Sequence, residues 1–461
     1  MTKDDDNNDT LPCERVDVVE RGDSAREDRL TCEIGEHIIL ETDSLASYFL
    51  AQWEPLVFDA LLVAAGVEFC DKVKRRPKLG WGRTFELRVP VSDPDRWKSP
   101  KVHDALIDAV QFLTGDVWDI TFVKRRKVLK TPQETLQLSV NGDLAVLPFS
   151  EGLDSRAVAG LMVDKWGDRL IRVRLGTKAH DRPKTPSGRP QPFTTIPYEV
   201  KPAGYSFPES SARSRGFKFS MLSGIAAYLS KAQTIVMPES GQGALGPVLV
   251  PVGQAYGDYR NHPLFAVCME ALLEALFGHK VRFEFPRLWF TKGETLAAYL
   301  SVSGNAEWSK TRSCWQDNRH ASVDGKRRQC GICAACMLRR LSVHSAGLKE
   351  NRETYVWEDL KAHTFEEGAA AGLKKIDGAQ REYAIAGTLH LDHLANLKSA
   401  AIHAPTIRLN TSQLAKALNL QEHLVKNKLN RLLDKHSSEW KAYMTSLGSK
   451  SFVNRWTGRA A

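Results

Sequence analysis

Six consecutive residues, Ser150 to Ser155, have the types and spacing of a phosphate-binding turn. The apolar run 144–149 predicts a buried strand before them, and apolar residues at helical spacing predict a helix after them. Such a turn leaves the backbone N–H groups of the helix start free to bind an anion. Ser150 and Ser155 add hydroxyl donors, and Gly152 allows close approach of a ligand. An ordinary strand-to-helix turn of small polar residues fits the same six positions equally well.

Four bunched cysteines form a second candidate site. Residues 330–336 read CGICAAC, which contains two overlapping CxxC steps through Cys330, Cys333 and Cys336, and Cys314 lies upstream. Four thiolates complete a closed tetrahedral Zn²⁺ site with no open position for water, so this site is expected to be structural. A metal-free reduced cluster and an iron–sulfur centre are the less favoured alternatives.

The composition is that of an ordinary globular protein. With 461 residues, 42% hydrophobic and 26% charged, the chain is long enough for two or three domains. No apolar run has the length needed to cross a bilayer, so no membrane partner is expected. The acidic start MTKDDDNNDT does not resemble a secretory signal, and a cytoplasmic location is therefore expected.

The net charge of +9 raises the question of nucleic acid. Basic residues gather in the last 41 positions of the chain and in the run 124–127. Solvated helix faces are the favoured explanation, because no recognised DNA- or RNA-binding signature accompanies the charge. A nucleic-acid groove remains the less favoured alternative.

The pattern along the chain predicts four regions. They are a disordered acidic tail (1–30), an N-terminal α+β domain (31–140), a PP-loop domain with the four-cysteine zinc site (141–350) and a helical C-terminal region (351–461). From residue 144 onward, strands and helices alternate, which predicts an α/β fold with a doubly wound parallel sheet. Ligands bind such sheets beyond the carboxyl ends of the strands, where Ser150–Ser155 would lie.

Within the N-terminal domain, the pattern predicts a helix from residue 56 that ends by Gly66, and another over 102–113. Strands are expected over 36–41, 84–90, 118–123 and 135–140. This region contains no recognisable chemical motif.

The candidate turn resembles the SGGxDS loop of the PP-loop ATP pyrophosphatases, with Glu151 in place of the first glycine. The elements SCW at 313–315 and CGICAACMLR at 330–339 resemble the zinc motif of the 7-cyano-7-deazaguanine synthases, the QueC family. TKGE at 291–294 is similar to the (T)KxE element of that family, and Arg215 in SRGFKFS is similar to its helix arginine. These elements occur in family order.

The resemblance implies a PP-loop fold (adenine nucleotide alpha hydrolase-like) with a zinc-binding lid. It also implies an ATP-dependent ligase that forms a carbon–nitrogen bond by adenylating the carboxylate of a 7-deazaguanine. The residues implied in binding the phosphates and Mg²⁺ are Ser150, Gly152, Leu153, Asp154 and Ser155. The residues implied in catalysis are Asp154, Lys292 and Arg215, the two cations neutralising charge on the pyrophosphate and acyl-adenylate. A surface salt bridge is the alternative role for Arg215 and for Lys292.

We expect Asp154 to lie on an exposed turn at a helix start. On that expectation, Asp154→Ala removes pyrophosphate release and costs little stability beyond a helix-end interaction.

The chain is longer than a simple synthase at both ends. Long QueC-like proteins of this shape resemble the branch associated with anti-phage defence operons (QatC-like), for which the resemblance implies an amine on a partner protein as the alternative to ammonia. The implied partners are ATP, a 7-deazaguanine-type small molecule and protein partners of a defence operon. The alternative is a catalytically degenerate nucleotide-binding subunit of a defence complex, which the departure at Glu151 favours.

Glu151→Gly separates these two alternatives. Two like charges about 4 Å apart cost about 4 kcal/mol at an effective dielectric near 20, which weakens binding about a thousandfold. We expect the affinity for ATP to change little, because a working loop must turn this carboxylate away from the triphosphate. Calorimetry of the wild type and the variant measures the difference, and a large gain in affinity would favour the degenerate subunit.

Overall fold

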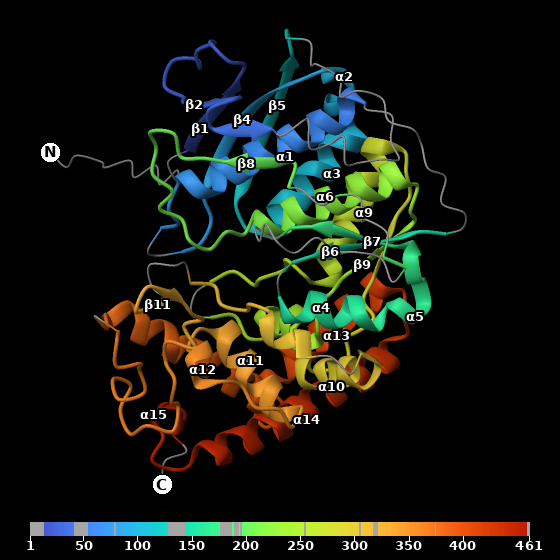
Figure 1. Cartoon of the computed structure of the whole chain (residues 1–461). Helices are drawn as coiled ribbons and strands as arrows, with labels where there is room; N and C mark the ends of the chain where they lie inside the picture. Colours follow the sequence, from blue (N-terminus) through green and yellow to red (C-terminus); the bar gives the residue numbers. More distant parts are fainter. Residues whose placement is uncertain are drawn as a thin grey trace, which may run out of the picture.

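The computed structural model describes residues 13–40, 54–77, 80–127, 143–150, 152–175, 187–188, 193, 196–252, 255–303, 306–316, 321–373 and 375–458. Two parallel sheets lie at different levels of the molecule, with a double layer of helices between them (Figure 1). Further helices cover the outer face of the second sheet and extend to the C-terminal end.

The first sheet has the strand order β2-β1-β4-β5 and is parallel throughout. Its strands are β1 (Cys13–Val19), β2 (Leu30–Glu33), β4 (Thr84–Val91) and β5 (Val117–Lys124). Burial alternates along β4 and β5, because one face of the sheet packs on α1 (Pro55–Val73) and α3 (Pro100–Thr114). The short helix α2 (Pro94–Lys98) precedes α3.

Three expectations for this region were wrong. Residues 13–19, placed in a disordered tail, form β1, whose apolar residues Val16, Val18 and Val19 are buried. The sheet alternates with helices as an α/β unit and does not have the segregated α+β pattern. Helix α1 continues past Gly66 to Val73, because this glycine faces Leu87 closely and is fully packed. The expected strand over 135–140 lies outside the described residues.

The second sheet confirms the expected parallel architecture. Its order is β10-β9-β6-β7, with β6 (Ala145–Phe149), β7 (Leu170–Arg174), β9 (Thr234–Val236) and β10 (Arg282–Glu284). The chain places β7 on one side of β6 and then returns to place β9 on the other side. The position between the carboxyl ends of β6 and β9 is therefore the topological switch point, where ligands bind in such folds.

Helices α6 (Arg215–Ser230) and α9 (Pro263–Phe277) join the two sheets into one core. They cover one face of the second sheet, and their other sides pack on α1 and α3. Gly224 of α6 lies so close to Leu273 of α9 that an added Cβ would come within 2.3 Å of that side chain. The opposite face of the second sheet packs on α4 (Leu153–Leu161) and α5 (Val163–Trp166).

Several smaller elements complete the description. They are β3 (Ile38–Leu40) paired with β8 (Tyr198–Val200), β11 (Ser322–Val323) paired with β12 (Lys326–Arg327), α7 (Gly241–Ala244), α8 (Gly246–Leu249), α10 (Lys292–Ser303), α11 (Ala334–Ser345), α12 (Gly378–Asn396), α13 (Ala404–Leu418), α14 (Glu422–Leu447) and α15 (Phe452–Trp456). The helical C-terminal region is thus observed from α12 onward. Within the described part of the chain, no helix combines the length and apolarity needed to span a membrane.

A buried ion network fixes the start of α6 against the first sheet. Asp71, at the end of α1, pairs with Arg83 at 2.6 Å and accepts the backbone N–H of Ser214 at 2.8 Å. Burial alone would raise the pKa of Asp71, but the Arg83 charge and these hydrogen bonds outweigh it and hold the pKa below its usual value. Ser214 immediately precedes Arg215, so this network positions a candidate site residue.

Asp71→Ala is expected to lower the free energy of unfolding by about 3–5 kcal/mol, because it leaves buried partners uncompensated. Asp104, whose side chain is 76% exposed, supplies the control, since its replacement by Ala should change stability by about 0.5 kcal/mol or less. Denaturant unfolding measures both values. Equal stabilities of the two variants would show that the network contributes nothing.

Candidate active site and metal centre

The Ser150–Ser155 turn lies at the carboxyl end of β6 and leads into α4, as the strand–turn–helix pattern predicts. The Ser155 hydroxyl donates to the Ser150 carbonyl oxygen at 2.8 Å, and the two Oγ atoms lie 2.9 Å apart. The Gly152 N–H points to Ser150 Oγ at 3.2 Å. These bonds close the turn around the start of α4. Glu151 lies outside the described residues.

Asp154 and Lys292 form an ion pair across the site, and each residue is only 7% exposed. The expectation that Asp154 is exposed was therefore wrong, because α10 brings Lys292 over the first turn of α4. Burial alone would lower the pKa of Lys292, but the nearby carboxylates of Asp154 and Glu239 hold it above its usual value. Lys292 is thus a charged group in a largely dry site.

Glu239 is the third member of this charge cluster, and sequence reasoning missed it. It follows β9, so it lies across the switch point from Asp154. Burial, together with the Asp154 charge, raises the pKa of Glu239 to about 8. Asn261 donates its side-chain amide to Glu239 Oε2 at 3.1 Å. Two carboxyl groups and one ammonium therefore meet at the carboxyl edge of the sheet.

The backbone around Lys292 is fixed from both sides. Thr291 and Glu294 form reciprocal hydrogen bonds at the start of α10, each side chain accepting the other residue's N–H, at 2.9 and 3.1 Å. The N–H of Lys292 itself donates to the side-chain oxygen of Gln242 at 2.8 Å. The TKGE element thus serves both to begin the helix and to aim its lysine at Asp154.

Gln242 connects this lysine to the C-terminal helices. Its side-chain amide donates to His436 Nδ1 at 2.7 Å, and His436 Nε2 donates to the Leu391 carbonyl at 2.9 Å. Burial lowers the pKa of His436 to about 4, so the ring is neutral, as this pattern of one donor and one acceptor nitrogen requires. Helices α12 and α14 therefore support the site, although their sequence gave no chemical signal.

Arg215 begins α6 at the same edge of the sheet. Among the described residues it has no ion-pair partner, and its guanidinium lies over the Phe219 ring at 4.8 Å. Arg215 is exposed, yet neighbouring protein atoms partly desolvate its guanidinium; this desolvation first, and then the charge of Arg260, lower its pKa. Nothing brings Arg215 into direct contact with Asp154 or Lys292. The salt-bridge alternative is not observed for Arg215, whereas Lys292 forms a buried pair and not a surface one.

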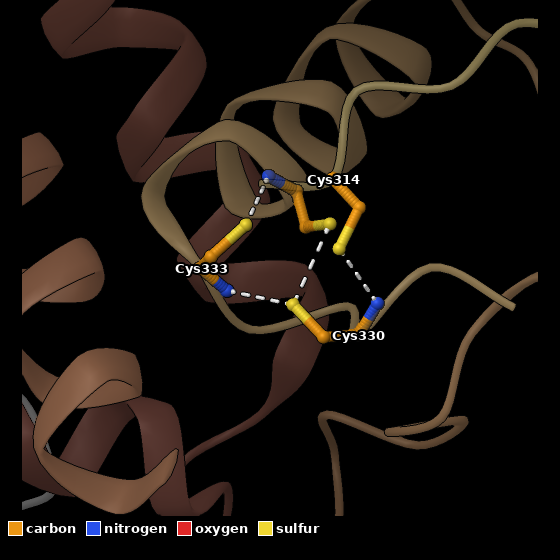
Figure 2. Close-up of side chains that lie close together, drawn as sticks. Cys314, Cys330 and Cys333 are labelled. Atoms are coloured by element: carbon orange, nitrogen blue, oxygen red, sulfur yellow. Dashed lines mark hydrogen bonds between the residues drawn. The ribbon is translucent and has the colours of Figure 1, made fainter. Parts of the chain in front are cut away.

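The four cysteines Cys314, Cys330, Cys333 and Cys336 gather around one point, with their sulfur atoms within 4.8 Å of one another. Figure 2 shows the side chains of Cys314, Cys330 and Cys333 directed toward a common centre. Zn–S bonds of about 2.3 Å in a tetrahedron place sulfurs about 3.8 Å apart. The Cys330 and Cys336 sulfurs lie 3.8 Å apart, so the donor set fits Zn²⁺.

Backbone N–H groups support the sulfurs. The N–H groups of Cys330, Cys333 and Cys336 point to the sulfurs of Cys314, Cys330 and Cys333 at 3.2, 3.3 and 3.4 Å (Figure 2). Gly331 has φ +86° and packs on the Trp357 carbonyl oxygen, so a side chain there would be both strained and crowded. These N–H donors stabilise the thiolate form of the cysteines and hold the CxxC turns in the conformation that a metal ion requires.

The cysteine centre lies beside the phosphate-type turn. A Cβ built on Gly152 would lie 3.9 Å from the carbonyl oxygen of Arg312, two residues before Cys314. Buried Arg339 holds the preceding segment, because it donates to Thr311 Oγ1 at 2.6 Å and pairs with Glu350 at 2.9 Å. The cysteine-rich segment thus forms one wall of the candidate active site.

One zinc ion per chain is expected, and its loss should destabilise the wall beside Gly152. Metal analysis of the wild type and of the Cys333→Ser, Cys336→Ser double variant measures this. The matched control is Cys13→Ser with Cys268→Ser, two cysteines away from the cluster. Zinc retained by the double variant, or no zinc in the wild type, would contradict the assignment.

Comparison with known proteins finds a match, and it covers the segment that contains Lys292 and the cysteine cluster. A family model described as queuosine biosynthesis protein QueC matches residues 253–347, which include Lys292 and all four clustered cysteines but not the Ser150–Ser155 turn or Arg215. No curated protein and no solved structure gives a significant match. The chain therefore contains a segment similar to QueC, beside a PP-loop-type turn that lies outside that segment.

Proposed function

We propose that this protein is an ATP-dependent QueC-like synthase that adenylates the carboxylate of a 7-deazaguanine acid for attack by an amine. The observation that supports this most is the ion pair between Asp154 and Lys292. It joins a residue of the PP-loop-type turn to a residue of the QueC-matched segment, although 138 positions separate them in the sequence. Two independently recognised motifs thus share one site.

The chemistry needs a good leaving group, because a carboxylate is a poor electrophile until it is activated. ATP supplies the adenylyl group when bound. The N–H groups at the start of α4 and the hydroxyls of Ser150 and Ser155 are placed to bind its phosphates. Lys292, charged and buried, is placed to stabilise the negative charge that develops on the departing pyrophosphate.

The carboxyl pair fits a divalent cation. Asp154 Oδ1 is buried without a hydrogen-bond partner among the described residues, and Glu239 lies beside it with a raised pKa. Mg²⁺ is bound by one or two carboxylates together with substrate phosphates, and its charge would relieve the repulsion between these groups. Asp154 and Glu239 are the residues that would hold it.

Arg215 is placed to meet an anionic group of the acid or of the adenylate. It is a cation without an ion-pair partner in the described part of the chain, at the carboxyl edge of the sheet, and Arg260 beside it adds to the positive potential. Zinc has a structural role in this proposal, since four sulfurs leave no open coordination position. The acceptor amine is ammonia or an amine of a partner protein in an anti-phage defence system.

Asp154→Asn and Lys292→Met are each expected to reduce pyrophosphate release at least a hundredfold, because each removes a charge aimed at the reacting phosphates. The assay contains ATP, Mg²⁺ and 7-carboxy-7-deazaguanine, with mass spectrometry of the products. We choose Asn because its side-chain oxygen still accepts a hydrogen bond from Lys292, whereas Asp154→Ala would leave the buried ammonium without that acceptor and would cost about 3–5 kcal/mol of stability.

The matched controls are Glu284→Gln and Lys165→Met, which break an exposed ion pair on the same sheet and should leave the rate within about twofold. Melting curves establish that each variant is folded. If the wild type binds nucleotide but releases no pyrophosphate, the proposed synthase function is wrong and the degenerate nucleotide-binding subunit takes its place. Release that is unchanged in Asp154→Asn would remove the catalytic assignment.

A further inference from the structure

We infer that α13 and α14 form a helix-turn-helix surface that binds double-stranded DNA, a function beyond the proposed synthase activity. Three residues, Asn419 to Gln421, separate the two helices. Asn419 has φ +51° and ψ +49°, the left-handed conformation that ends the first helix and redirects the chain. A three- or four-residue turn with such a position is characteristic of this motif.

The pair packs with α12 and, on the same apolar cluster, with α7, α8 and the segment after β10. The cluster contains Leu394 and Leu397 around the end of α12, Leu414 and Ala415 from α13, Val425, Leu429, Leu432 and Leu433 from α14, and Ala244, Leu245, Leu249, Val250 and Leu288 from the preceding segments. The helices α12 and α13 both contact α14, which makes α14 the central element. Its buried positions follow the i, i+4, i+7, i+8 pattern, so one stripe of α14 is committed to the core.

The other side of the first half of α14 is exposed to solvent, and Lys428 extends over the Trp289 ring at 6.0 Å. His423, Leu424, Lys426, Asn427 and Lys428 are all exposed, and only Val425 among residues 422–428 is buried. Lys and Asn side chains are suited to phosphates and base edges in the major groove. This half of α14 therefore has the exposure that a recognition helix requires.

The charge of the surface favours a polyanion. From the start of α13 to Arg431, the exposed cations are Arg408, Lys416, Lys426, Lys428 and Arg431, and the exposed acid is Glu422. Asp434, further along α14, is also exposed and pairs with Lys398. Arg431 pairs with Glu294, but Lys426 and Lys416 have no ion-pair partner among the described residues. Phosphates of a duplex complement unpaired exposed cations of this kind.

Helix α14 lies at the periphery of the molecule. Figure 1 shows it along the end opposite the first sheet. The composition of the tail alone favoured solvated helix faces. The structure adds three observations that charge alone does not give: the turn between the helices, the apolar cluster on which they pack, and the exposure of the second helix. We therefore propose DNA as the ligand. An acidic protein would account for the charge of the surface but not for the helix-turn-helix arrangement.

The test uses the full chain and fluorescence anisotropy with a labelled 30-base-pair duplex of mixed sequence. We expect saturable binding that the double variant Lys426→Glu, Lys428→Glu weakens at least tenfold. The slope of log K against log salt should fall by about 1.8, since each phosphate contact contributes about 0.9. The control double variant Lys101→Glu, Lys280→Glu makes the same change in net charge on other exposed positions and should bind within about twofold of wild type.

The same strands offered singly, and a double-stranded RNA of equal length, should bind more weakly than the DNA duplex. The inference would be overturned by any of three results. These are an equal loss of affinity in the control variant, equal binding of the single strands or RNA, and no binding to the duplex at low salt. If the charge-reversal variant has a lower melting temperature, the double variant Lys426→Gln, Lys428→Gln is used in its place. The same change in the salt slope is expected of it. Pyrophosphate release by both variants is expected to stay at the wild-type rate, which separates this test from that of the synthase.

Discussion

Lys292 and Asp154 are two opposite charges in a place where water barely reaches, and the site is arranged around that constraint. A buried charge without a partner costs several kcal/mol, so α10 and the turn after β6 must stay together. The hydrogen bonds to Gln242 and within Thr291–Glu294 keep the lysine backbone where this pair requires it. Glu239 adds a second carboxyl, whose raised pKa keeps its proton until a cation arrives to stabilise the charged form.

The cysteine centre has a different physical basis. The positions of its sulfurs are fixed by N–H donors and by the left-handed turn at Gly331. Helix α12 adds support, because Gly387 packs against Ala334. Rigid support of this kind lets a closed metal site act as a structural anchor. The segment that ends in this anchor also passes over Gly152, so the metal centre and the phosphate-type turn share a wall.

Local signals predicted the parts of the molecule that depend on local order. The turn at Ser150–Ser155, the helix Pro100–Thr114 (expected over 102–113) and the four-cysteine cluster all follow from spacing, because their partners lie near in sequence or share one motif. The second parallel sheet followed from alternation of strands and helices. The match of residues 253–347 to the QueC model agrees with the resemblance seen in the cysteine and lysine motifs.

The errors concern properties that only long-range packing decides. Asp154 looks exposed when it is read as a turn residue, and it becomes buried because α10 covers it. His436 lies 194 positions from Gln242, and no periodicity indicates that they touch. Strand β1 was hidden in a charged stretch, because Arg15 and Asp17 alternate with valines that enter the core. Asp17 itself is buried by Arg26 and Arg29, charges that look like a disordered tail in sequence.

The helices between the two sheets have a consequence for how the chain can be divided. Phe217 and Met221 of α6, with Leu272 and Leu276 of α9, belong to a core that also contains Val57 and Leu61 of α1. A fragment that begins after the first sheet would expose this apolar layer to water, at about 25 cal/mol for each Å². The matched segment 253–347 lacks β6, β7 and β9 as well, so it retains only β10 of the second sheet. Fragments cut at the boundaries of sequence motifs should therefore aggregate, and the smallest soluble form must retain both sheets.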